Sequence, residues 1–281
     1  MSKVSVITGG AGGMGLETAK IVGKDRPVVI CDVNQDRLDA AVNTLKGSGI
    51  TCKAVVCDVT DRNSVAELIE TATGLGTVAS VVHTAGVSPS MGEADLIMRI
   101  NAIGTVNVNE AFYRVAGEGF AIVNVASMSA HMLPKALVPT RRFKYALRDE
   151  VAFMKKMMSA CNIVPEKARP GIAYAISKSF VRWYSTTQAE RFGSRGARIV
   201  SVSPGSFDTE MGRLEERLGS GAMARRGALQ RLGKPEEIAE LLAFCASGKA
   251  SYLTGTDILC DGGVTASMTL WDMVRPRPPR S

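Results

Sequence analysis

Short apolar runs alternate along the chain with longer segments in which apolar residues recur at helical spacing. Several runs are apolar at nearly every position, as expected for strands covered on both faces, and the runs lie at 4–8, 27–31, 52–57, 78–84, 120–126, 198–203 and 257–259. The segments between them predict helices, among them 35–46, 62–73, 95–116, 173–191 and 235–246. This alternation predicts an α/β fold: a doubly wound parallel sheet of about seven strands with helices on both faces.

Two segments depart from this alternation. Residues 131–170 carry no strand signal, and a structureless loop of that length is rare in a compact domain. Its apolar residues recur at steps of three and four, at Phe143, Leu147, Val151, Met154, Met158 and Cys161. This spacing predicts an amphipathic helix over 143–161 that packs on its own subunit, within a helical insertion. The other segment, 206–234, is rich in glycine and arginine and is expected to form a mobile substrate cover.

Length and composition fit a single globular domain over residues 1–281, because no repeat or linker interrupts the alternation. The net charge of +7 comes partly from a basic, proline-rich tail at 272–281. A nucleic-acid-binding protein would need a basic stripe or an aromatic stacking motif elsewhere, and the sequence has neither. We therefore expect a solvated tail and no nucleic-acid partner.

The cysteines and histidines do not predict a metal site. The six cysteines include no C-x-x-C pair, and only two histidines are present. The sequence has no apolar run of about 18 residues and no charged leader with a cleavage site before the first strand. We therefore expect a soluble, cytoplasmic protein with no metal and no membrane partner.

The first predicted strand runs into VITGGAGGMGLETA, which has five glycines in seven positions. Two spacings overlap there: G-x-G-x-x-G at Gly10, Gly12 and Gly15, and T-G-x-x-x-G-x-G at Thr8, Gly9, Gly13 and Gly15. A strand, a tight glycine turn and a helix place backbone N–H groups at a helix N-terminus, where they favour a pyrophosphate. The loop therefore predicts a dinucleotide-binding domain, and the fold is expected to be of the Rossmann type.

Acidic residues follow at the ends of the next two predicted strands. Asp32 stands seventeen residues after Gly15, where a carboxylate can accept from both adenosine ribose hydroxyls and would repel a 2′-phosphate. No Arg or Lys interrupts the glycine loop or directly follows Asp32, so we expect NAD rather than NADP. Asp58 either accepts from the adenine amino group or caps a helix, and the residues alone leave both roles open.

The stretch GIAYAISKS places Tyr174 and Lys178 four residues apart on a predicted helix, so both lie on one face. A free tyrosine hydroxyl has a pKa of about 10. An ammonium one turn away stabilises the phenolate and is expected to lower the pKa of Tyr174 toward neutral pH, as a general acid/base requires.

Together with its neighbours, this pair makes the chain resemble the short-chain dehydrogenase/reductase family over nearly its whole length. TGGAGGMG fits the glycine pattern of that family and favours the spacing that begins at Thr8. HTAG at 83–86 resembles the family's N-N-A-G, with His83 and Thr84 replacing both asparagines, which we interpret as local packing variants. The remaining matches are INAIG, VNVASMSA, YAISK, SPGSFDTEM and LTGTDILCDGG.

The resemblance implies a role for each catalytic candidate. Tyr174 would be the general acid/base, and Lys178 would lower its pKa and bind the nicotinamide ribose. Ser127 would hydrogen-bond the substrate oxygen, with Ser129 as the alternative two residues further on. Asn101 would support a water relay. The implied cofactor residues are Thr8, Gly9, Gly13, Met14, Gly15, Asp32, Val33, Asp58, Val59, Ala85, Gly86, Tyr174, Lys178, Pro204, Gly205, Phe207 and Thr209.

One departure from the family concerns the insertion. Tyr174 follows Ser127 by 47 positions (from 127 to 174), whereas the family usually has about a dozen. A similar insertion occurs in bacterial hydroxysteroid dehydrogenase/carbonyl reductase relatives, so a hydroxysteroid or another bulky alcohol is expected. The insertion is expected near the substrate cleft or near the helix of Tyr174, which often forms a subunit interface in the family. We expect a homo-oligomer, either a dimer or a tetramer.

The leading prediction is an NAD-dependent oxidoreductase that interconverts a small-molecule secondary alcohol and its ketone. A 3-oxoacyl-carrier-protein reductase is the alternative enzyme. Asp32 argues against it because reductive synthesis normally uses NADPH. Arginines within 206–234, among them Arg213, Arg217, Arg225 and Arg226, would fit an acidic substrate or form a solvated face. A non-catalytic NAD-binding sensor or scaffold is the alternative of another class, but such proteins usually lose the tyrosine or the lysine.

Overall fold

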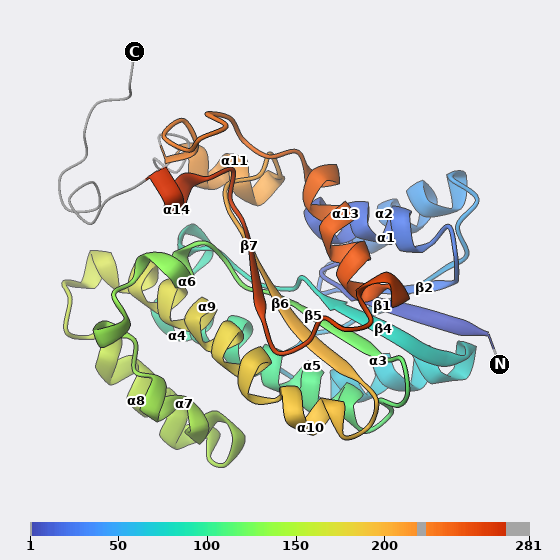
Figure 1. Ribbon diagram of the computed structural model, residues 1–281, viewed down its shortest axis with the longest axis horizontal. Helices are drawn as coiled ribbons and strands as arrows, with labels where there is room; N and C mark the ends of the chain where they lie inside the picture. The colour runs from blue at the N-terminus through green and yellow to red at the C-terminus, as the bar shows by residue number, and fades with distance from the viewer. Residues whose placement is uncertain (1, 218–222, 268–281) are drawn as a thin grey trace.

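A computed structural model of the chain describes residues 2–217 and 223–267, so the predicted tail at 272–281 and part of the predicted cover lie outside the described residues. Seven strands form one parallel sheet in the order β3-β2-β1-β4-β5-β6-β7 (Figure 1). They are β1 (Lys3–Thr8), β2 (Val28–Asp32), β3 (Cys52–Val56), β4 (Thr77–His83), β5 (Ala121–Val125), β6 (Arg198–Pro204) and β7 (Asp257–Cys260). Each predicted strand is present, and the predicted fold class is confirmed.

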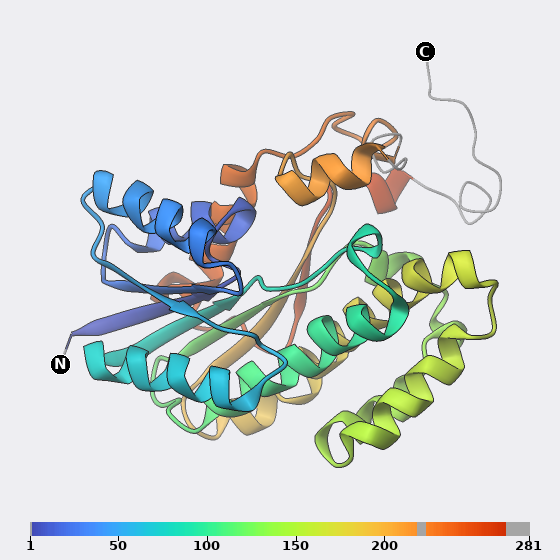
Figure 2. The same cartoon turned by 180° about the vertical axis from the view of Figure 1, so that it is seen from behind.

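Helices cover both faces of the sheet, as Figures 1 and 2 show. One face carries α1 (Gly13–Val22), α2 (Gln35–Gly47) and α13 (Pro235–Ala246). The other face carries α3 (Arg62–Leu75), α5 (Gly104–Tyr113), α9 (Arg169–Thr187) and α10 (Ala189–Gly193). Among the described residues, no helix is long and apolar enough to cross a bilayer.

The strands separate two hydrophobic cores, because successive side chains of a strand point to opposite faces. Ile122 of β5 packs into the core beneath α3, α5 and α9, whereas its neighbour Val123 packs into the core beneath α1, α2 and α13. On β1, Val6 and Ile7 divide in the same way. All four side chains are fully buried, which explains why these runs are apolar at nearly every position.

The strand order reverses between β1 and β4, which are neighbours in the sheet although two strands separate them in the sequence. The connections from β1 and from β4 leave in opposite directions, so a crevice forms at the carboxyl ends of these two strands. In open parallel sheets this switch point is where ligands bind. The glycine loop follows β1 directly, and the segment that begins at Thr84 follows β4.

Two predicted helices are broken in the structure. The helix predicted over 95–116 is present as α4 (Ala94–Met98), one π-helical turn (Arg99–Ile103) and α5. The helix predicted over 143–161 is interrupted and its predicted face is wrong in part: Phe143, Met154 and Cys161 are buried as predicted, whereas Leu147 and Val151 are exposed. It consists of α7 (Thr140–Phe143), a 3-10 turn (Lys144–Leu147) and α8 (Glu150–Cys161).

The phase error at α8 has a local cause. The carboxylate of Asp149 accepts a hydrogen bond of 2.9 Å from the backbone N–H of Ala152, so a new helix begins there and its face is reset. Val151, predicted to face the core, is 81% exposed, whereas Phe153 and Met157 are fully buried.

The insertion packs on its own subunit, along α4 and α9. Aromatic rings form much of this contact: Phe143 lies 5.4 Å from Phe180, and Phe153 lies 5.3 Å from the same ring, measured between centroids. Trp183 of α9 completes the cluster at 5.6 Å from Phe143. A short helix, α6 (Ser129–Met132), connects the insertion to the strand end that carries Ser127.

Candidate active site

The glycine loop between β1 and α1 has two residues in left-handed conformations, Gly9 with φ +65° and Gly13 with φ +51°. A Cβ on Gly9 would lie 2.9 Å from the backbone N of Ala85, and a Cβ on Gly15 would lie 2.3 Å from the carbonyl oxygen of Gly9. At Gly12 the nearest atom would be the flexible end of an arginine. The backbone therefore requires glycine at the positions of the T-G-x-x-x-G-x-G spacing.

A cavity of about 790 Å³ opens in front of this loop at the switch point. It has the size expected for a cofactor site. Eleven of the predicted cofactor residues line it: Gly9, Gly13, Met14, Gly15, Asp32, Val33, Asp58, Val59, Ala85, Gly86 and Thr209. The structure thus brings together residues from the ends of β1, β2, β3, β4 and β6.

The other predicted cofactor residues do not line this cavity. Thr8 is fully buried, and its hydroxyl lies 2.7 Å from Nδ1 of His83 and accepts from the backbone N–H of Ala85 at 3.3 Å. Phe207 is buried against Gly233, and Gly205 follows Pro204 at the end of β6. These residues shape the backbone around the cavity.

Arg37 lines the cavity and was missed in the sequence. It lies in the first turn of α2, where a Cβ on Gly12 would be only 2.8 Å from its Nη2 atom, and it forms an ion pair of 3.1 Å with Glu210. The sequence-based choice between NAD and NADP considered basic residues only within the glycine loop and directly after Asp32. In the first turn of a helix, position 37 faces back toward the glycine loop. The helix predicted over 35–46 therefore already indicated that Arg37 would lie near the cofactor.

Tyr174 and Lys178 lie on one face of α9, as predicted. The Lys178 ammonium donates a hydrogen bond of 2.9 Å to the carbonyl oxygen of Val125 and lies 5.8 Å from the centroid of the Tyr174 ring. The Ser127 hydroxyl acts to lower the pKa of Tyr174 and accepts a hydrogen bond of 3.2 Å from the backbone N–H of Ser129. By contrast, the Ser129 hydroxyl is buried and has no hydrogen-bond partner in the described part of the chain. The geometry therefore favours Ser127 over Ser129.

The electrostatics of this pair differ from the expectation. Burial raises the pKa of Tyr174, the hydrogen bond from Ser127 lowers it, and the negative charge of Glu215 raises it further. The predicted lowering is wrong for this structure, because desolvation disfavours the phenolate more than its neighbours stabilise it. Burial also lowers the pKa of Lys178 to about 8, so this ammonium can exchange a proton near neutral pH.

Asn101 lies on the π-helical turn, a feature frequent at functional sites. Its Oδ1 accepts from the backbone N–H of Val87 at 2.9 Å, and its Nδ2 donates to the carbonyl oxygen of Val87 at 3.0 Å and to Ser177 Oγ at 3.2 Å. Ser177 in turn donates to the carbonyl oxygen of Tyr174 at 2.8 Å. Asn101 therefore joins the turn after β4 to the helix that carries Tyr174.

Gly86 connects the cavity to the catalytic candidates. A Cβ at this position would lie 3.0 Å from Asn101 Oδ1 and 3.3 Å from Lys178 Nζ. The Lys178 ammonium therefore lies next to a residue that lines the cavity, although Lys178, Tyr174 and Ser127 do not themselves line it. A cofactor bound there would have one end beside the catalytic face of α9.

His83 and Thr84 have packing roles. The His83 ring is buried between the hydroxyls of Thr8 and Thr105, at 2.7 and 3.2 Å, and does not line the cavity. Burial, assisted by the charge of Lys178, lowers the pKa of His83 to about 3. Thr84 donates a hydrogen bond of 2.6 Å to the carbonyl oxygen of Thr8 and so holds β4 against β1.

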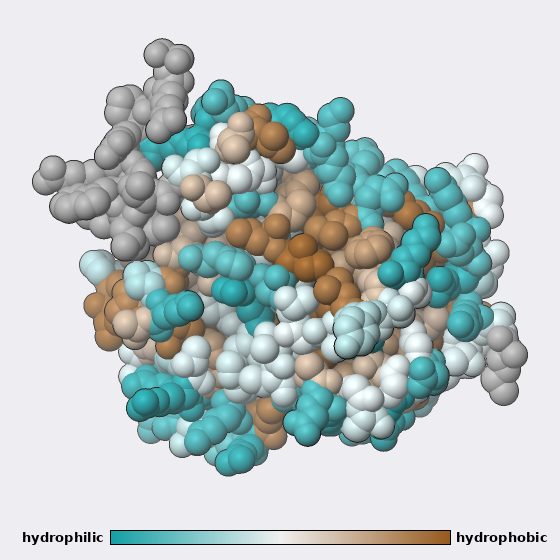
Figure 3. All heavy atoms as spheres, in the orientation of Figure 1, coloured by the Kyte–Doolittle hydropathy of each residue, from teal (hydrophilic) through white to brown (hydrophobic). Residues whose placement is uncertain are grey.

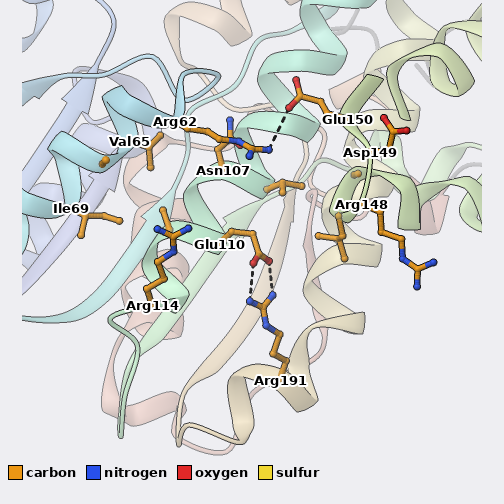
Figure 4. Close-up of a pocket in the computed structure, with 15 residues that line it drawn as sticks. Arg62, Val65, Ile69, Asn107, Glu110, Arg114, Arg148, Asp149, Glu150 and Arg191 are labelled. Atoms are coloured by element: carbon orange, nitrogen blue, oxygen red, sulfur yellow. Dashed lines mark hydrogen bonds and ion pairs between the residues drawn. The ribbon is translucent and has the colours of Figure 1, made fainter. Parts of the chain in front are cut away.

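A second cavity, of about 470 Å³, lies between α3, α5 and the insertion (Figure 4). None of the predicted site residues lines it. Its charged side chains are largely paired: Arg191 donates to both carboxylate oxygens of Glu110 at 2.6 and 2.8 Å, and Arg62 lies 3.6 Å from Glu150. The insertion thus forms one wall of this cavity, which is separate from the cofactor cavity.

Two family models match consecutive parts of the chain. The model described as short chain dehydrogenase matches residues 3–139, and the model described as Enoyl-(Acyl carrier protein) reductase matches residues 151–265. Only the middle of the insertion, 140–150, separates the two matched ranges.

Curated proteins and solved structures agree with these matches. The chain is 29% identical over 274 residues to the short-chain dehydrogenase/reductase bsc3 of Alternaria brassicicola, with 96% of this chain and 98% of the relative covered. It is 29% identical over 275 residues to the 3-oxoacyl-acyl-carrier-protein reductase FabG of Thermotoga maritima, with 93% and 97% covered. A short chain dehydrogenase from Burkholderia cenocepacia in complex with NADP has the same fold, with a TM-score of 0.74 at 24% identity over 94% of this chain and 98% of that one.

Proposed function

We propose that this chain, which belongs to the short-chain dehydrogenase family and is an oxidoreductase acting on CH–OH groups, interconverts a secondary alcohol and its ketone with NAD as the hydride partner. The observation that carries the proposal is the position of Lys178 one helical turn from Tyr174 on α9 and next to Gly86 of the cofactor cavity, with Ser127 acting to lower the pKa of Tyr174. The cavity fits a dinucleotide because the glycine loop that begins α1 lines it together with Asp32 at the end of β2.

Each catalytic side chain has a distinct task in this reaction. Bound NAD would accept the hydride from the carbinol carbon. Tyr174, a neutral phenol at rest, gives up its own proton toward Lys178 as it takes the proton of the substrate hydroxyl, and Ser127 donates a hydrogen bond to the substrate oxygen as negative charge develops there. Lys178 holds the nicotinamide ribose and, with a pKa of about 8, can pass a proton between Tyr174 and solvent. Asn101 fixes the position of Tyr174 through Ser177 and supports the water relay.

The choice of NAD rests on Asp32, which lines the cavity at the end of β2. A carboxylate at this position accepts from the ribose hydroxyls and repels a 2′-phosphate. Arg37 is the group that could offset this repulsion, but its guanidinium already forms an ion pair with Glu210. We therefore propose a preference for NAD with some residual use of NADP.

A 3-oxoacyl-carrier-protein reductase is the second candidate, supported by the FabG relative and by the description of the second family model. The acidic carrier protein that holds such a substrate would need free cationic side chains on the predicted cover at 206–234. Arg213 does not provide one, because it donates a hydrogen bond of 2.6 Å to Asp208. We favour an alcohol dehydrogenase acting on a bulky alcohol such as a hydroxysteroid.

We also propose a homo-oligomer that forms through the face of β7 and α13. Figure 3 shows apolar side chains gathered there, and Phe244, Tyr252 and Leu259 are large apolar residues exposed on these elements and the turn between them. Since the insertion covers the outer side of α9, the helix that often forms a second interface in the family, we propose a dimer.

The six cysteines, all within the described residues, are free thiols, which fits the cytoplasm.

The proposed function is tested by following the absorbance of reduced nicotinamide over a panel of secondary alcohols and 3-hydroxyacyl thioesters. Hydroxysteroids belong in the panel, and each substrate is assayed with NAD and with NADP. Turnover of secondary alcohols with NAD supports the proposal, whereas turnover confined to the thioesters supports the second candidate. Tight NAD binding with no turnover of any substrate would contradict both and favour a sensor.

A further inference from the structure

Helix α11 (Glu210–Arg217) lies over the cofactor cavity and is held at two points. At one end, Glu210 forms the 3.1 Å ion pair with Arg37 of α2. Toward the other end, Glu215 accepts hydrogen bonds from the backbone N–H of Ser90 at 3.2 Å and from its hydroxyl at 2.5 Å. Figure 2 shows α11 next to the turn between β4 and α4, which contains Ser90. The helix therefore spans the cavity from its adenosine end to its substrate end.

The turn that receives Glu215 is itself connected to the catalytic helix. Ser90 lies in a 3-10 turn (Pro89–Met91), and its hydroxyl is 3.0 Å from the hydroxyl of Ser88, which is buried. The preceding residue, Val87, is bound through both backbone polar groups to Asn101, and from there through Ser177 to Tyr174. Glu215 and Tyr174 are therefore the two ends of one polar connection around the substrate side of the cavity.

The carboxylate of Glu215 lies on Ser90, next to the lining residues Met91 and Leu214, although Glu215 does not itself line the cavity. Its negative charge raises the pKa of Tyr174, and it is the one carboxylate with this effect among the described residues. Several side chains that line the cavity near this turn are apolar, namely Val87, Met91, Met211 and Leu214, and the charge of Arg213, which also lines it, is paired with Asp208. In such surroundings a charge–charge interaction is several times stronger than in water.

We propose that Glu215 is a specificity-determining residue: anchored on Ser90, it selects alcohols and ketones that carry no anionic group near the carbinol. A carboxylate or phosphate on the substrate would enter an apolar space that already holds one negative charge. This inference rests on the proposed function and narrows its substrate class to uncharged secondary alcohols.

The kinetic test compares cyclohexanol with cis-4-hydroxycyclohexanecarboxylate, which differ by one carboxylate. We expect wild type to prefer the neutral alcohol in kcat/KM by about tenfold or more, and Glu215→Gln, which can still accept from Ser90, to reduce that preference about tenfold. Glu93→Gln is the matched control, because Glu93 is exposed near the same turn and has no side-chain hydrogen bond to the described residues. An unchanged preference in Glu215→Gln, or a wild-type preference for the acid, would overturn the proposal.

Two measurements do not depend on turnover. The phenol of Tyr174 is titrated by ultraviolet absorbance, with Tyr174→Phe subtracted, and its pKa is expected to fall in Glu215→Gln. Hydrogen exchange of the α11 amides is expected to accelerate at least tenfold in Ser90→Ala, which removes one of the anchoring hydrogen bonds. If wild type oxidises neither alcohol, the proposed function has failed for these substrates. In that case an unchanged Tyr174 titration or unchanged α11 exchange still overturns the role of Glu215.

Discussion

The ammonium of Lys178 lies 5.8 Å from the centroid of the Tyr174 ring, one helical turn away on α9. Lys178 is buried and Tyr174 is half-buried, and desolvation lowers the pKa of Lys178 to about 8 while it raises that of Tyr174. The protonated lysine beside the neutral phenol is therefore the resting arrangement near neutral pH. Proton removal from Tyr174 has to be assisted by charge that develops during the reaction, so these side chains should have larger effects on kcat than on cofactor affinity.

Ser127 and Ser129 should differ sharply in their effect on the reaction. Ser127→Ala removes the hydroxyl that bonds Tyr174 and is expected to lower kcat by about 10²-fold, the loss typical of one transition-state hydrogen-bond donor. Ser129→Ala removes a buried hydroxyl without a hydrogen-bond partner among the described residues and should leave kcat within about threefold. Steady-state kinetics of both variants provide the comparison, and a larger loss in Ser129→Ala would reverse the assignment.

Cofactor preference should depend on two side chains of opposite charge. Asp32→Ala removes the carboxylate that repels a 2′-phosphate and is expected to raise kcat/KM for NADP relative to NAD by at least tenfold. Arg37→Ala should act in the opposite direction, because Arg37 is the cation that lines this end of the cavity. Kinetics with both cofactors at saturating alcohol test the pair. A wild-type preference for NADP would contradict the role given to Asp32.

His83 should make the fold sensitive to acid. The pKa of His83 is about 3 in the folded chain, against about 6.5 for an ordinary histidine, so between these pH values the unfolded chain binds a proton that the folded chain does not. The stability contributed by neutral His83 is complete above pH 6.5 and is lost as the pH falls toward 3, by up to a few kcal/mol. Thermal unfolding from pH 7 to pH 4 should show a smaller loss of Tm in His83→Asn. An equal loss in both proteins would place the acid sensitivity elsewhere.

The corrected phase of α8 predicts which of its side chains stabilise the insertion. Phe153→Ala empties a fully buried site against Phe180 and is expected to lower the free energy of unfolding by about 3–5 kcal/mol. Val151→Asp, at an 81% exposed position, should change it by no more than about 0.5 kcal/mol. Chemical denaturation measures both free energies of unfolding. A large decrease in Val151→Asp would indicate that Val151 faces the core, as the sequence predicted.

Much of the fold could be predicted because its signals are local. Fully apolar strand runs, the glycine loop and the four-residue spacing of Tyr174 and Lys178 each depend on a few adjacent residues. The phase of α8 was missed because the side chain of Asp149 starts a new helix, which the periodicity of apolar residues does not register. Because Val151 was counted as part of one continuous apolar helix face over 143–161, it was predicted to face the core, whereas it faces solvent.

The missed parts of the site depend on contacts between distant segments. Glu215 meets Ser90 across 125 positions of the chain, and no spacing in the sequence connects them. The pKa of Tyr174 was predicted in the wrong direction because its spacing from Lys178 shows the nearby charge but not the burial, which is larger in its effect. Arg37 was within reach of sequence reasoning, since its position in the first turn of a predicted helix faces back toward the glycine loop.

Proton transfer by Tyr174 in an alcohol–ketone reaction is tested by measuring the turnover of Tyr174→Phe beside its affinity for NAD. We expect kcat with the best alcohol of the panel to fall by at least about 10³-fold, while the dissociation constant for NAD changes less than about threefold. Wild-type turnover retained in Tyr174→Phe would contradict the claim.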